Sequence, residues 1–308
     1  MSPAIRHFLS VADWSAEELL AMLDRARELK RLHARGRRPR TLEGLTLALY
    51  FEKPSLRTHV TFEAGMTQLG GHAILLHRGQ VGVGTRESAA DVARNLSRWI
   101  DGLVARTFSH ALVEELASHA TIPVINGLTD LLHPCQAMAD LLTISERKPL
   151  REAEIAYVGD GNNVANSLLL AAAVLGLRLR LGTPASHRPA VRIRERAAEL
   201  AARSGARITF TDDPVEAVRG ADFVYTDAWT SMGQEHEAGE RRRIFEPYRV
   251  DAALLAHAPD ALVMHCLPAH RGEEITDEVL DGERSIVFDQ AENRLHAQKA
   301  ILERVMSV

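Results

Sequence analysis

The fold is decided by residues 45–63, which read LTLALYFEKPSLRTHVTFE. The apolar run at 45–51 predicts a short buried strand. Pro54 interrupts this run and disfavours helical geometry at Lys53, and residues 61–69 are again compatible with a helix. A strand, a polar turn and a helix start predict an anion site, because first-turn N–H groups lack partners and carry the positive end of the helix dipole.

The turn supplies side chains that suit an anion. Ser55 and Thr58 offer hydroxyls and Arg57 offers a guanidinium, and together they would hold a phosphate-like group by charge-assisted hydrogen bonds. The alternative is a helix N-cap beside a surface arginine. The local pattern fits both interpretations, so the rest of the chain must separate them.

Length and composition indicate a globular protein. The chain has 308 residues, enough for two α/β domains, each with its own core. With 46% apolar and 25% charged residues, disorder is not expected. The net charge of −4 and the lack of a dominant basic block argue against nucleic acid as a partner. The basic cluster at 35–40 is interpreted as a solvated loop.

The cysteines and the apolar segments indicate a cellular setting. Cys135 and Cys266 are the only two cysteines, which does not suit a disulfide scaffold. Residues 1–9 lack an apolar core of signal-peptide length, and apolar windows such as 167–177 are too short to span a bilayer. We therefore expect a soluble, cytoplasmic protein with no membrane partner.

Strand-like and helix-like segments alternate along the chain, which predicts βαβ units and mostly parallel sheets. Predicted strands after the first are 73–76, 102–106, 122–126, 154–158, 178–182, 207–211, 223–226, 262–265 and 286–288. The expected fold is α/β, with two doubly wound parallel-sheet domains joined by long helices. The domains are expected at 1–140 and 141–290, and a closing helix at 291–308 is expected to pack back on the first.

Polar residues recur where predicted strands end. They are Ser55, Arg57, Thr58, Arg106, His133, Gln136, Asp160, Asn162, Asn163, Asp227, Ser231, Met232, His265, Cys266 and Arg294. In open α/β sheets ligands bind outside the carboxyl ends of the strands. Because so many segments converge on such edges, we interpret residues 45–63 as a phosphate cradle.

Two other motifs have competing interpretations. Gly159-Asp160-Gly161 follows a predicted strand, but it lacks the third glycine of a dinucleotide-binding motif. His265, Cys266 and His270 suggest zinc, but they lack a matched second pair of ligands. A turn after a buried strand accounts for them equally well.

Several of these segments carry a family resemblance. Residues 54–58 (PSLRT) resemble the Ser-x-Arg-Thr-Arg signature of the aspartate/ornithine carbamoyltransferase superfamily, and residues 133–136 (HPCQ) resemble its His-Pro-x-Gln signature. Residues 159–163 (GDGNN), 227–233 (DAWTSMG), 265–268 (HCLP) and 291–294 (AENR) resemble the ornithine branch specifically. The resemblance runs over nearly the whole chain.

The resemblance implies transfer of the carbamoyl group of carbamoyl phosphate to the δ-amine of L-ornithine, giving citrulline and phosphate in arginine metabolism. The first domain would bind carbamoyl phosphate and the second ornithine, with a cleft where they meet. It implies catalytic roles for Arg106, His133, Cys266 and Arg294. It implies a carbamoyl phosphate site of Ser55, Leu56, Arg57, Thr58, Gln80, Arg106, His133, Gln136, Cys266, Leu267 and Arg294. It implies an ornithine site of Asn163, Asp227, Ser231 and Met232, and a homotrimer or an assembly of trimers.

This chemistry requires such residue types. The δ-amine must lose its proton before it attacks the carbonyl carbon, and the tetrahedral intermediate then places negative charge on the former carbonyl oxygen. Arg106, His133 and Thr58 would supply donors to that oxygen. Phosphate leaves while bound by its cationic cradle, so we expect no metal and no cofactor. The amine proton is expected to go to Cys266 or to the departing phosphate. Alternatively, Cys266 is simply a small buried apolar residue.

The chain departs from the family pattern at two positions. His59 occupies the fifth signature position, where arginine is usual. Imidazole is shorter and mostly neutral at pH 7, so we interpret His59 as supporting the site rather than contacting the ligand. A glycine-rich loop is predicted at 79–84. In it Gly82 stands where many relatives have a glutamine that binds carbamoyl phosphate, and Gln80, shifted two residues earlier, is the nearest substitute.

Other functions follow from the same motifs. A sister carbamoyltransferase would use putrescine, lysine or an N-acylated ornithine. Asp227 with Ser231 and Met232 favours a free α-amino acid, because a carboxylate pairs with an α-ammonium. A non-catalytic homologue that binds carbamoyl phosphate is favoured only by His59 and the shifted loop. The sequence leaves open whether the reaction runs toward arginine synthesis or arginine breakdown.

Overall fold

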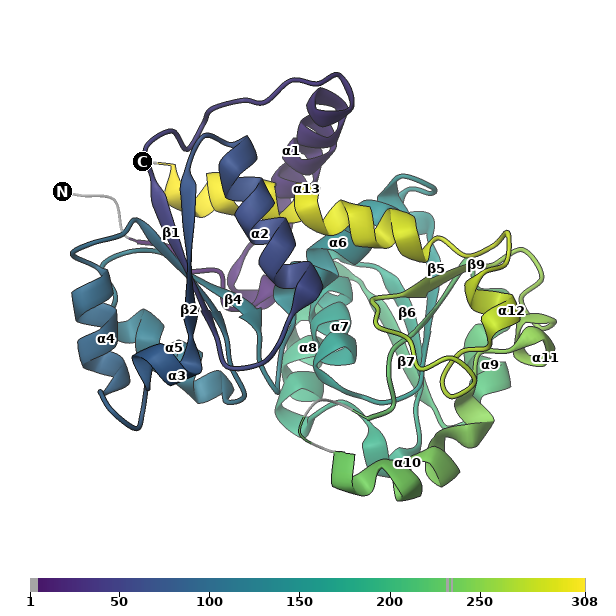
Figure 1. Cartoon of the computed structure of the whole chain (residues 1–308). Helices are drawn as coiled ribbons and strands as arrows, with labels where there is room; N and C mark the ends of the chain where they lie inside the picture. The colour runs from purple at the N-terminus through teal and green to yellow at the C-terminus, as the bar shows by residue number, and fades with distance from the viewer. Residues whose placement is uncertain (1–4, 231–232, 234, 308) are drawn as a thin grey trace. The chain divides into compact units, whose positions relative to one another are not determined.

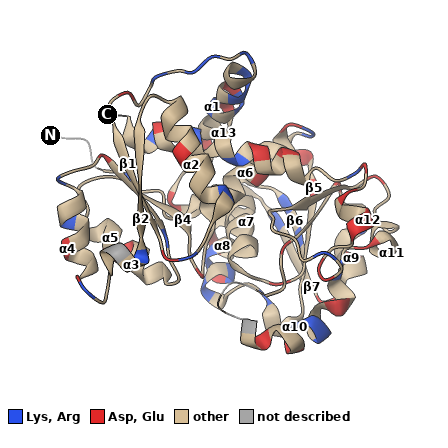
Figure 2. Cartoon of the chain, in the orientation of Figure 1, with Lys and Arg blue, Asp and Glu red and all other residues tan. Residues whose placement is uncertain are grey.

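The computed structural model describes residues 5–230, 233 and 235–307, without the side chains of Gln80 and Glu235. The chain forms two compact units, residues 1–142 with 293–308 and residues 143–292, coloured along the chain in Figure 1. Each unit contains one parallel β-sheet flanked by helices, which confirms the predicted α/β class. In the view of Figure 2, acidic and basic residues are interspersed along helices such as α1 and α10.

The first unit is built on a four-stranded sheet in the order β2-β1-β3-β4. The strands are β1 (Thr46–Phe51), β2 (His72–His77), β3 (Gly102–Arg106) and β4 (Val124–Leu128). The chain moves from β1 to β2 on one side, and then returns to β3 on the other. The order therefore reverses between β1 and β3, which is where open α/β sheets bind ligands.

Helices cover this sheet, and the last one comes from the far end of the sequence. They are η1 (Val11–Asp13), α1 (Ala16–Ala34), α2 (Leu56–Gln68), α3 (Arg78–Val81), α4 (Ala89–Leu96), α5 (His110–His119), α6 (Pro134–Ser145) and α13 (Val287–Met306). Tyr50, Leu103 and Val124 pack with Val92 of α4 and Val113 of α5 in one buried cluster. A capping box at Ser15 and Glu18 begins α1.

Helix α13 is held to the first unit by polar contacts as well as by packing (Figure 1). Arg25 of α1 donates from Nε and Nη2 to the two carboxylate oxygens of Glu303, at 2.5 and 2.9 Å. Buried Lys299 donates to the Gln68 amide oxygen of α2 at 3.1 Å. Residues 293–306 of α13 are thus part of the first unit's core.

The second unit is built on a five-stranded sheet in the order β7-β6-β5-β8-β9. The strands are β5 (Glu154–Val158), β6 (Arg178–Gly182), β7 (Arg207–Thr211), β8 (Phe223–Thr226) and β9 (Leu262–His265). Its helices are η2 (Leu150–Glu152), α7 (Asn163–Leu175), η3 (Ala185–His187), α8 (Val191–Ser204), α9 (Pro214–Val218), η4 (Glu235–Glu237), α10 (Ala238–Phe245), η5 (Glu246–Tyr248), α11 (Ala252–Leu255) and α12 (Asp277–Leu280). Here the strand order reverses between β5 and β8.

Three predicted segments differ from the structure. The strand expected at 286–288 is wrong: Ser285 forms only an isolated bridge to Val263, and α13 begins at Val287. The helix expected from residue 61 begins at Leu56, because the Ser55 hydroxyl accepts from the backbone N–H of Thr58 at 3.2 Å and caps it there. The glycine-rich loop at 79–84 includes one helical turn, α3.

The Gly159-Asp160-Gly161 segment has a steric explanation. Gly159 has a φ of 131°, which side chains rarely tolerate. A Cβ on Gly161 would lie 2.3 Å from the backbone nitrogen of Pro189. Both glycines are therefore explained by the tight loop after β5, and neither needs a bound dinucleotide.

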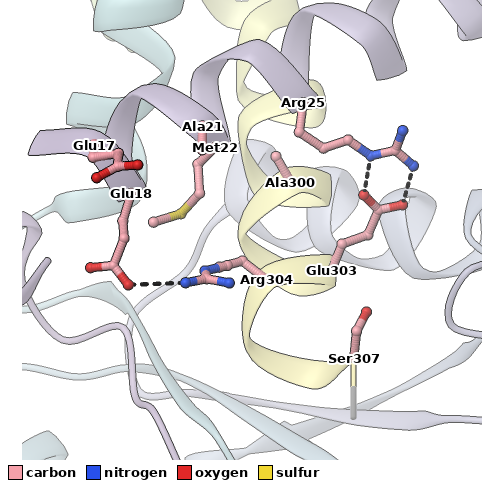
Figure 3. Close-up of a pocket in the computed structure, with 9 residues that line it drawn as sticks. All are labelled: Glu17, Glu18, Ala21, Met22, Arg25, Ala300, Glu303, Arg304 and Ser307. Atoms are coloured by element: carbon pink, nitrogen blue, oxygen red, sulfur yellow. Dashed lines mark hydrogen bonds and ion pairs between the residues drawn. The ribbon is translucent and has the colours of Figure 1, made fainter. Parts of the chain in front are cut away.

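A cavity of about 450 Å³ lies between α1 and α13 in the first unit (Figure 3). Four of its five charged side chains pair with one another: Arg25 binds Glu303, and Arg304 donates to Glu18 at 2.9 Å. None of the predicted site residues lines it. Among the helices of the described residues, none is long and apolar enough to cross a membrane.

Candidate functional site

The polar turn after β1 begins α2 at the switch point of the first sheet. Ser55 is the N-cap, and Leu56, Arg57 and Thr58 form the first turn. The two interpretations of this turn are therefore compatible. The Ser55 hydroxyl accepts from the third amide of the turn, that of Thr58. The first two amides, those of Leu56 and Arg57, have no carbonyl partner within the helix. These N–H groups and the dipole make the start of α2 suited to an anion.

Two arginines converge on the hydroxyl of Thr58, which is fully buried. Arg106 donates from Nη1 to Thr58 Oγ1 at 3.3 Å, and Arg294 donates from Nη2 to the same oxygen at 2.6 Å. A hydroxyl has two acceptor positions and one donor. Because guanidiniums use both acceptor positions, the Thr58 O–H remains as a donor, and the two nearby positive charges favour an anionic partner for it.

Local structure brings each arginine to this point. Arg106 ends β3, and the register of β3 with β4 shifts between Ala105 and Arg106. Such an irregularity at a strand end re-aims the side chain. Arg294 lies in the part of α13 that belongs to the first unit. Both guanidiniums are buried, with 6% and 3% of their residues' surfaces exposed.

Gln136 and His133 lie at the start of α6. Gln136 accepts from Arg294 Nη1 at 2.6 Å through its amide oxygen, and its amide nitrogen donates to Asp140 at 2.8 Å. These two bonds fix the orientation of the amide. Burial, with help from the Arg294 and Arg106 guanidiniums, lowers the pKa of His133 well below its usual value. The imidazole is therefore neutral at pH 7 and acts as a neutral hydrogen-bonding group.

A second polar cluster lies at the switch point of the other sheet, where β5 and β8 end. Asp227 follows β8, and both its oxygens have partners. Asn162, the N-cap of α7, donates to Oδ2 at 2.8 Å, and the Cys266 thiol donates to Oδ1 at 2.9 Å. Asn163 is the first residue of α7. Three strand ends of the second sheet thus meet at one carboxylate.

The turn after β9 has an unusual backbone. Leu267 has a φ of 57° and is followed by a cis peptide bond to Pro268. Positive φ is strained for a side chain of this size. The preceding Cys266 is 8% exposed, so its thiol is nearly enclosed where it meets Asp227.

The zinc interpretation of this turn loses one of its ligands. Asp227, His265 and Cys266 do lie with ligand atoms within 4.8 Å of one another. However, Nδ1 of His265 accepts from the Leu267 N–H at 2.9 Å, and Nε2 faces Glu274 Oε1 at 3.0 Å. With both ring nitrogens engaged, His265 has no lone pair to give a metal.

Comparison with known proteins assigns the family. The family model "Aspartate/ornithine carbamoyltransferase, carbamoyl-P binding domain" matches residues 6–146, and the model "Aspartate/ornithine carbamoyltransferase, Asp/Orn binding domain" matches residues 151–305. The chain belongs to the aspartate/ornithine carbamoyltransferase family.

Relatives within this carbamoyltransferase family are similar over nearly their full length. An ornithine carbamoyltransferase of Anoxybacillus flavithermus is 53% identical over 299 residues, covering 96% of this chain and 95% of that protein. One of Pyrococcus furiosus, named anabolic, is 50% identical over 308 residues, covering 99% and 98%. The solved ornithine carbamoyltransferase of Pyrococcus furiosus superposes with a TM-score of 0.95 at 50% identity, over 99% of this chain and 98% of that one. The anabolic enzyme of Campylobacter jejuni superposes with a TM-score of 0.91 at 37% identity, over 97% and 98%.

The site residues expected from the carbamoyltransferase resemblance fall into two groups. Those in the first unit are Ser55, Leu56, Arg57, Thr58, Arg106, His133, Gln136 and Arg294; those in the second are Asn163, Asp227, Cys266 and Leu267. Direct bonds join Thr58, Arg106, Arg294 and Gln136 in the first group, and Asp227 with Cys266 in the second. Ser231, Met232 and the Gln80 side chain lie outside the described residues, so their roles stay predictions.

Sequence reasoning missed partners that support these side chains. The sequence marks Asn162 only as a strand-end residue, yet its side chain binds Asp227. Nothing in the sequence marks Arg241 of α10. It is buried, donates from Nε to the Trp229 carbonyl at 2.6 Å, and pairs with Asp160 after β5. An arginine inside a run of charged residues gives no sequence signal that it is buried.

His59, the position that departs from the carbamoyltransferase signature, faces its own helix. Its Nε2 lies 2.9 Å from Glu63 Oε2, one turn later, and its ring contacts Phe51 edge-on. We expect His59→Arg to leave the KM for carbamoyl phosphate within about twofold of wild type, or to lower it, because arginine keeps the Glu63 pair and adds positive charge. Initial rates at varied carbamoyl phosphate check this. A tenfold loss would show that His59 contacts the substrate.

Proposed function

We propose that this chain is an ornithine carbamoyltransferase, which transfers the carbamoyl group of carbamoyl phosphate to the δ-amine of L-ornithine to form L-citrulline and phosphate. The first unit binds carbamoyl phosphate and the second binds ornithine. The relatives' names and the two family models support this activity.

In the first unit, the start of α2 holds the phosphate. The amides of Leu56 and Arg57, the Arg57 guanidinium and the Thr58 hydroxyl supply its hydrogen bonds, and the positive end of α2 adds to the attraction. The Arg106 and Arg294 guanidiniums, which already meet at Thr58, extend to the carbamoyl oxygen. Neutral His133 and the oriented Gln136 amide complete the contacts to the carbamoyl group.

One observation carries the choice of ornithine. The Asp227 carboxylate lies at the β5–β8 switch point, with the Cys266 thiol on one oxygen and Asn162 on the other. A carboxylate there pairs with the α-ammonium of a free amino acid. Asn163, Ser231 and Met232 are assigned to the rest of the α-amino and α-carboxylate groups, and Cys266 and Leu267 to the δ-amine end.

The reaction proceeds by attack of the neutral δ-amine on the carbonyl carbon. Negative charge develops on the carbonyl oxygen, where Arg106 and His133 donate, and the intermediate collapses by expelling phosphate into its cationic cradle. Because the Cys266 thiol donates to Asp227, an amine proton passed to sulfur requires the thiol proton to move to the carboxylate in the same step. Transfer to the departing phosphate needs no such coupling and is the simpler route.

A substrate comparison tests the proposal. Citrulline formation from L-ornithine is expected at a kcat/KM at least about 100-fold above that for putrescine, L-lysine or N-acetylornithine. N-acetylornithine lacks the α-ammonium and leaves Asp227 without its counter-charge, a loss of about 3 kcal/mol. Putrescine keeps an ammonium there but lacks the α-carboxylate assigned to Asn163, Ser231 and Met232. Lysine instead mispositions the reacting amine by one methylene. Activity confined to putrescine or N-acetylornithine would refute ornithine, and a folded protein with no activity on any of them would indicate a binding homologue.

We further propose that the enzyme works in the biosynthetic direction in the cytoplasm, as a homotrimer or an assembly of trimers. The name of the Pyrococcus furiosus relative supports the direction. Exposed apolar side chains of the first unit support assembly, since apolar patches mark protein–protein contact sites: Leu56 and Val60, one turn apart on α2, are 73% and 50% exposed, and Trp99 is 72% exposed. Light scattering is expected to give three times the chain mass of 34.0 kDa, or a multiple of that value. A single-chain mass would contradict the assembly.

A further inference from the structure

The turn that carries Cys266 is held from behind by a buried histidine and a buried glutamate. His265 and Glu274 are both fully buried. The Leu267 N–H donates to Nδ1 of the His265 ring at 2.9 Å, so Nδ1 carries no proton. The proton of the neutral ring is therefore on Nε2, which donates to Glu274 Oε1 at 3.0 Å. The backbone of the turn and the carboxylate together fix one tautomer.

The same carboxylate oxygen also binds the far end of the turn. The His270 N–H donates to Glu274 Oε1 at 2.6 Å, while the His265 N–H donates to the Gln290 amide oxygen at 2.9 Å. The residues on either side of 266–269 are thus both fixed: the His265 N–H binds Gln290, and the His270 N–H binds Glu274. A positive φ at a residue such as Leu267 persists only where its surroundings over-determine it. This network is what does so here.

We propose that His265 and Glu274 are positioning residues for the second substrate: they hold the Cys266–Leu267 turn in the conformation that receives the δ-amine. The inference rests on the proposed ornithine site. Neither side chain reaches the ligand itself, because both are enclosed behind the turn. Their effect passes through the Leu267 N–H, the strained Leu267 backbone and the adjoining Cys266 thiol.

Two substitutions of His265 test the two hydrogen bonds of its ring one at a time. In His265→Asn the amide occupies the place of Nδ1, keeps a partner for the Leu267 N–H, and is too short to reach Glu274. In His265→Gln the amide reaches Glu274 and leaves the Leu267 N–H without its acceptor. If both links are needed, each variant raises the KM for ornithine about tenfold, the usual range for one lost buried bond. The KM for carbamoyl phosphate stays within about twofold.

Matched controls accompany these variants. Glu274→Gln keeps an oxygen that accepts from both donors, so its ornithine KM is expected within about threefold of wild type. Glu273→Gln changes the neighbouring carboxylate, which pairs with Arg242 at the surface, and is expected to match wild type. A second readout is the ornithine concentration that protects Cys266 from alkylation by iodoacetamide. Cys135 does not interfere, because burial raises the pKa of its thiol to about 12. Protection by ornithine is expected to weaken about tenfold with either His265 variant.

The outcomes are distinct. Three results would each overturn the inference. The first is an unchanged ornithine KM in His265→Asn, and the second is an equal rise in KM for both substrates. The third is a fall in kcat alone that follows the fall in melting temperature. A wild-type protein that forms no citrulline would overturn the proposed function and this inference with it. Should both His265 variants fail to fold, ¹⁵N spectra of the wild-type histidines still decide: the His265 ring is expected as the Nε2–H tautomer, and the Nδ1–H form would overturn the proposal.

Discussion

Citrulline formation by an Arg106→Met enzyme is expected to show a kcat about 10³-fold below wild type. Methionine fills much of the space of the buried guanidinium, so packing is largely kept, but the charge proposed to face the developing oxyanion is lost. Removing one preorganised donor of this kind costs about 10²–10³-fold in rate. We place Arg106 at the upper end, because it is cationic, only 6% exposed, and shares Thr58 with Arg294.

The measurement is the steady-state rate with both substrates saturating, on protein whose melting temperature is checked. Arg94→Met is the matched control in the same unit: Arg94 lies on α4 and makes an exposed pair with Asp91, so its loss is expected to leave kcat unchanged. An Arg106→Met enzyme within tenfold of wild type would mean that the guanidinium does not face the reacting carbonyl.

Asp227→Asn is expected to raise the KM for ornithine about 100-fold, with the KM for carbamoyl phosphate within twofold. The substitution keeps the shape of the side chain and removes the charge proposed to pair with the α-ammonium. It also brings an amide N–H₂ into a site where Asn162 and the Cys266 thiol both already donate. Removing one partner of an enclosed charge pair costs about 2–5 kcal/mol, and the lower half of that range corresponds to the factor expected.

Initial rates over a wide range of ornithine concentrations test this, because the expected effect is on the KM for ornithine and not on the KM for carbamoyl phosphate. Asp260→Asn, at an exposed carboxylate just before β9, serves as the control. If Asp227→Asn lowered kcat and left the ornithine KM alone, Asp227 would instead belong to the proton-transfer step.

The strands and their polar ends could be predicted because each depends on local sequence. β3 and β5 occur at the predicted residues, and Arg106 ends one buried strand while Asp227 follows another, as the apolar runs indicate. The sheet order then brings neighbouring strand ends together without further information from the sequence. Residues 286–288 show the limit of this reasoning. A short apolar run fits a buried strand or the buried face of a helix equally well, and packing of α13 decided for the helix.

The supporting contacts could not be predicted, because they join residues far apart whose burial depends on the whole fold. Glu274 and Arg241 are charged residues in polar segments, and such residues are usually exposed. Both are buried, and each acquires its role from partners on other segments: Glu274 from His265, and Arg241 from the Trp229 carbonyl and Asp160. Sequence reasoning therefore finds the residues proposed to touch substrate more readily than those that hold them.

The way α13 joins the first unit has a consequence for how the protein is made. Thr58 receives one of its two guanidiniums from Arg294, which the ribosome adds 236 residues later. Glu303 and Lys299, which bind Arg25 and Gln68, come later still. The second unit, at residues 143–292, is continuous in sequence. All the strands of the second unit are available before residues 293–308 emerge. The second unit can therefore fold on the nascent chain while the first unit still lacks its last helix.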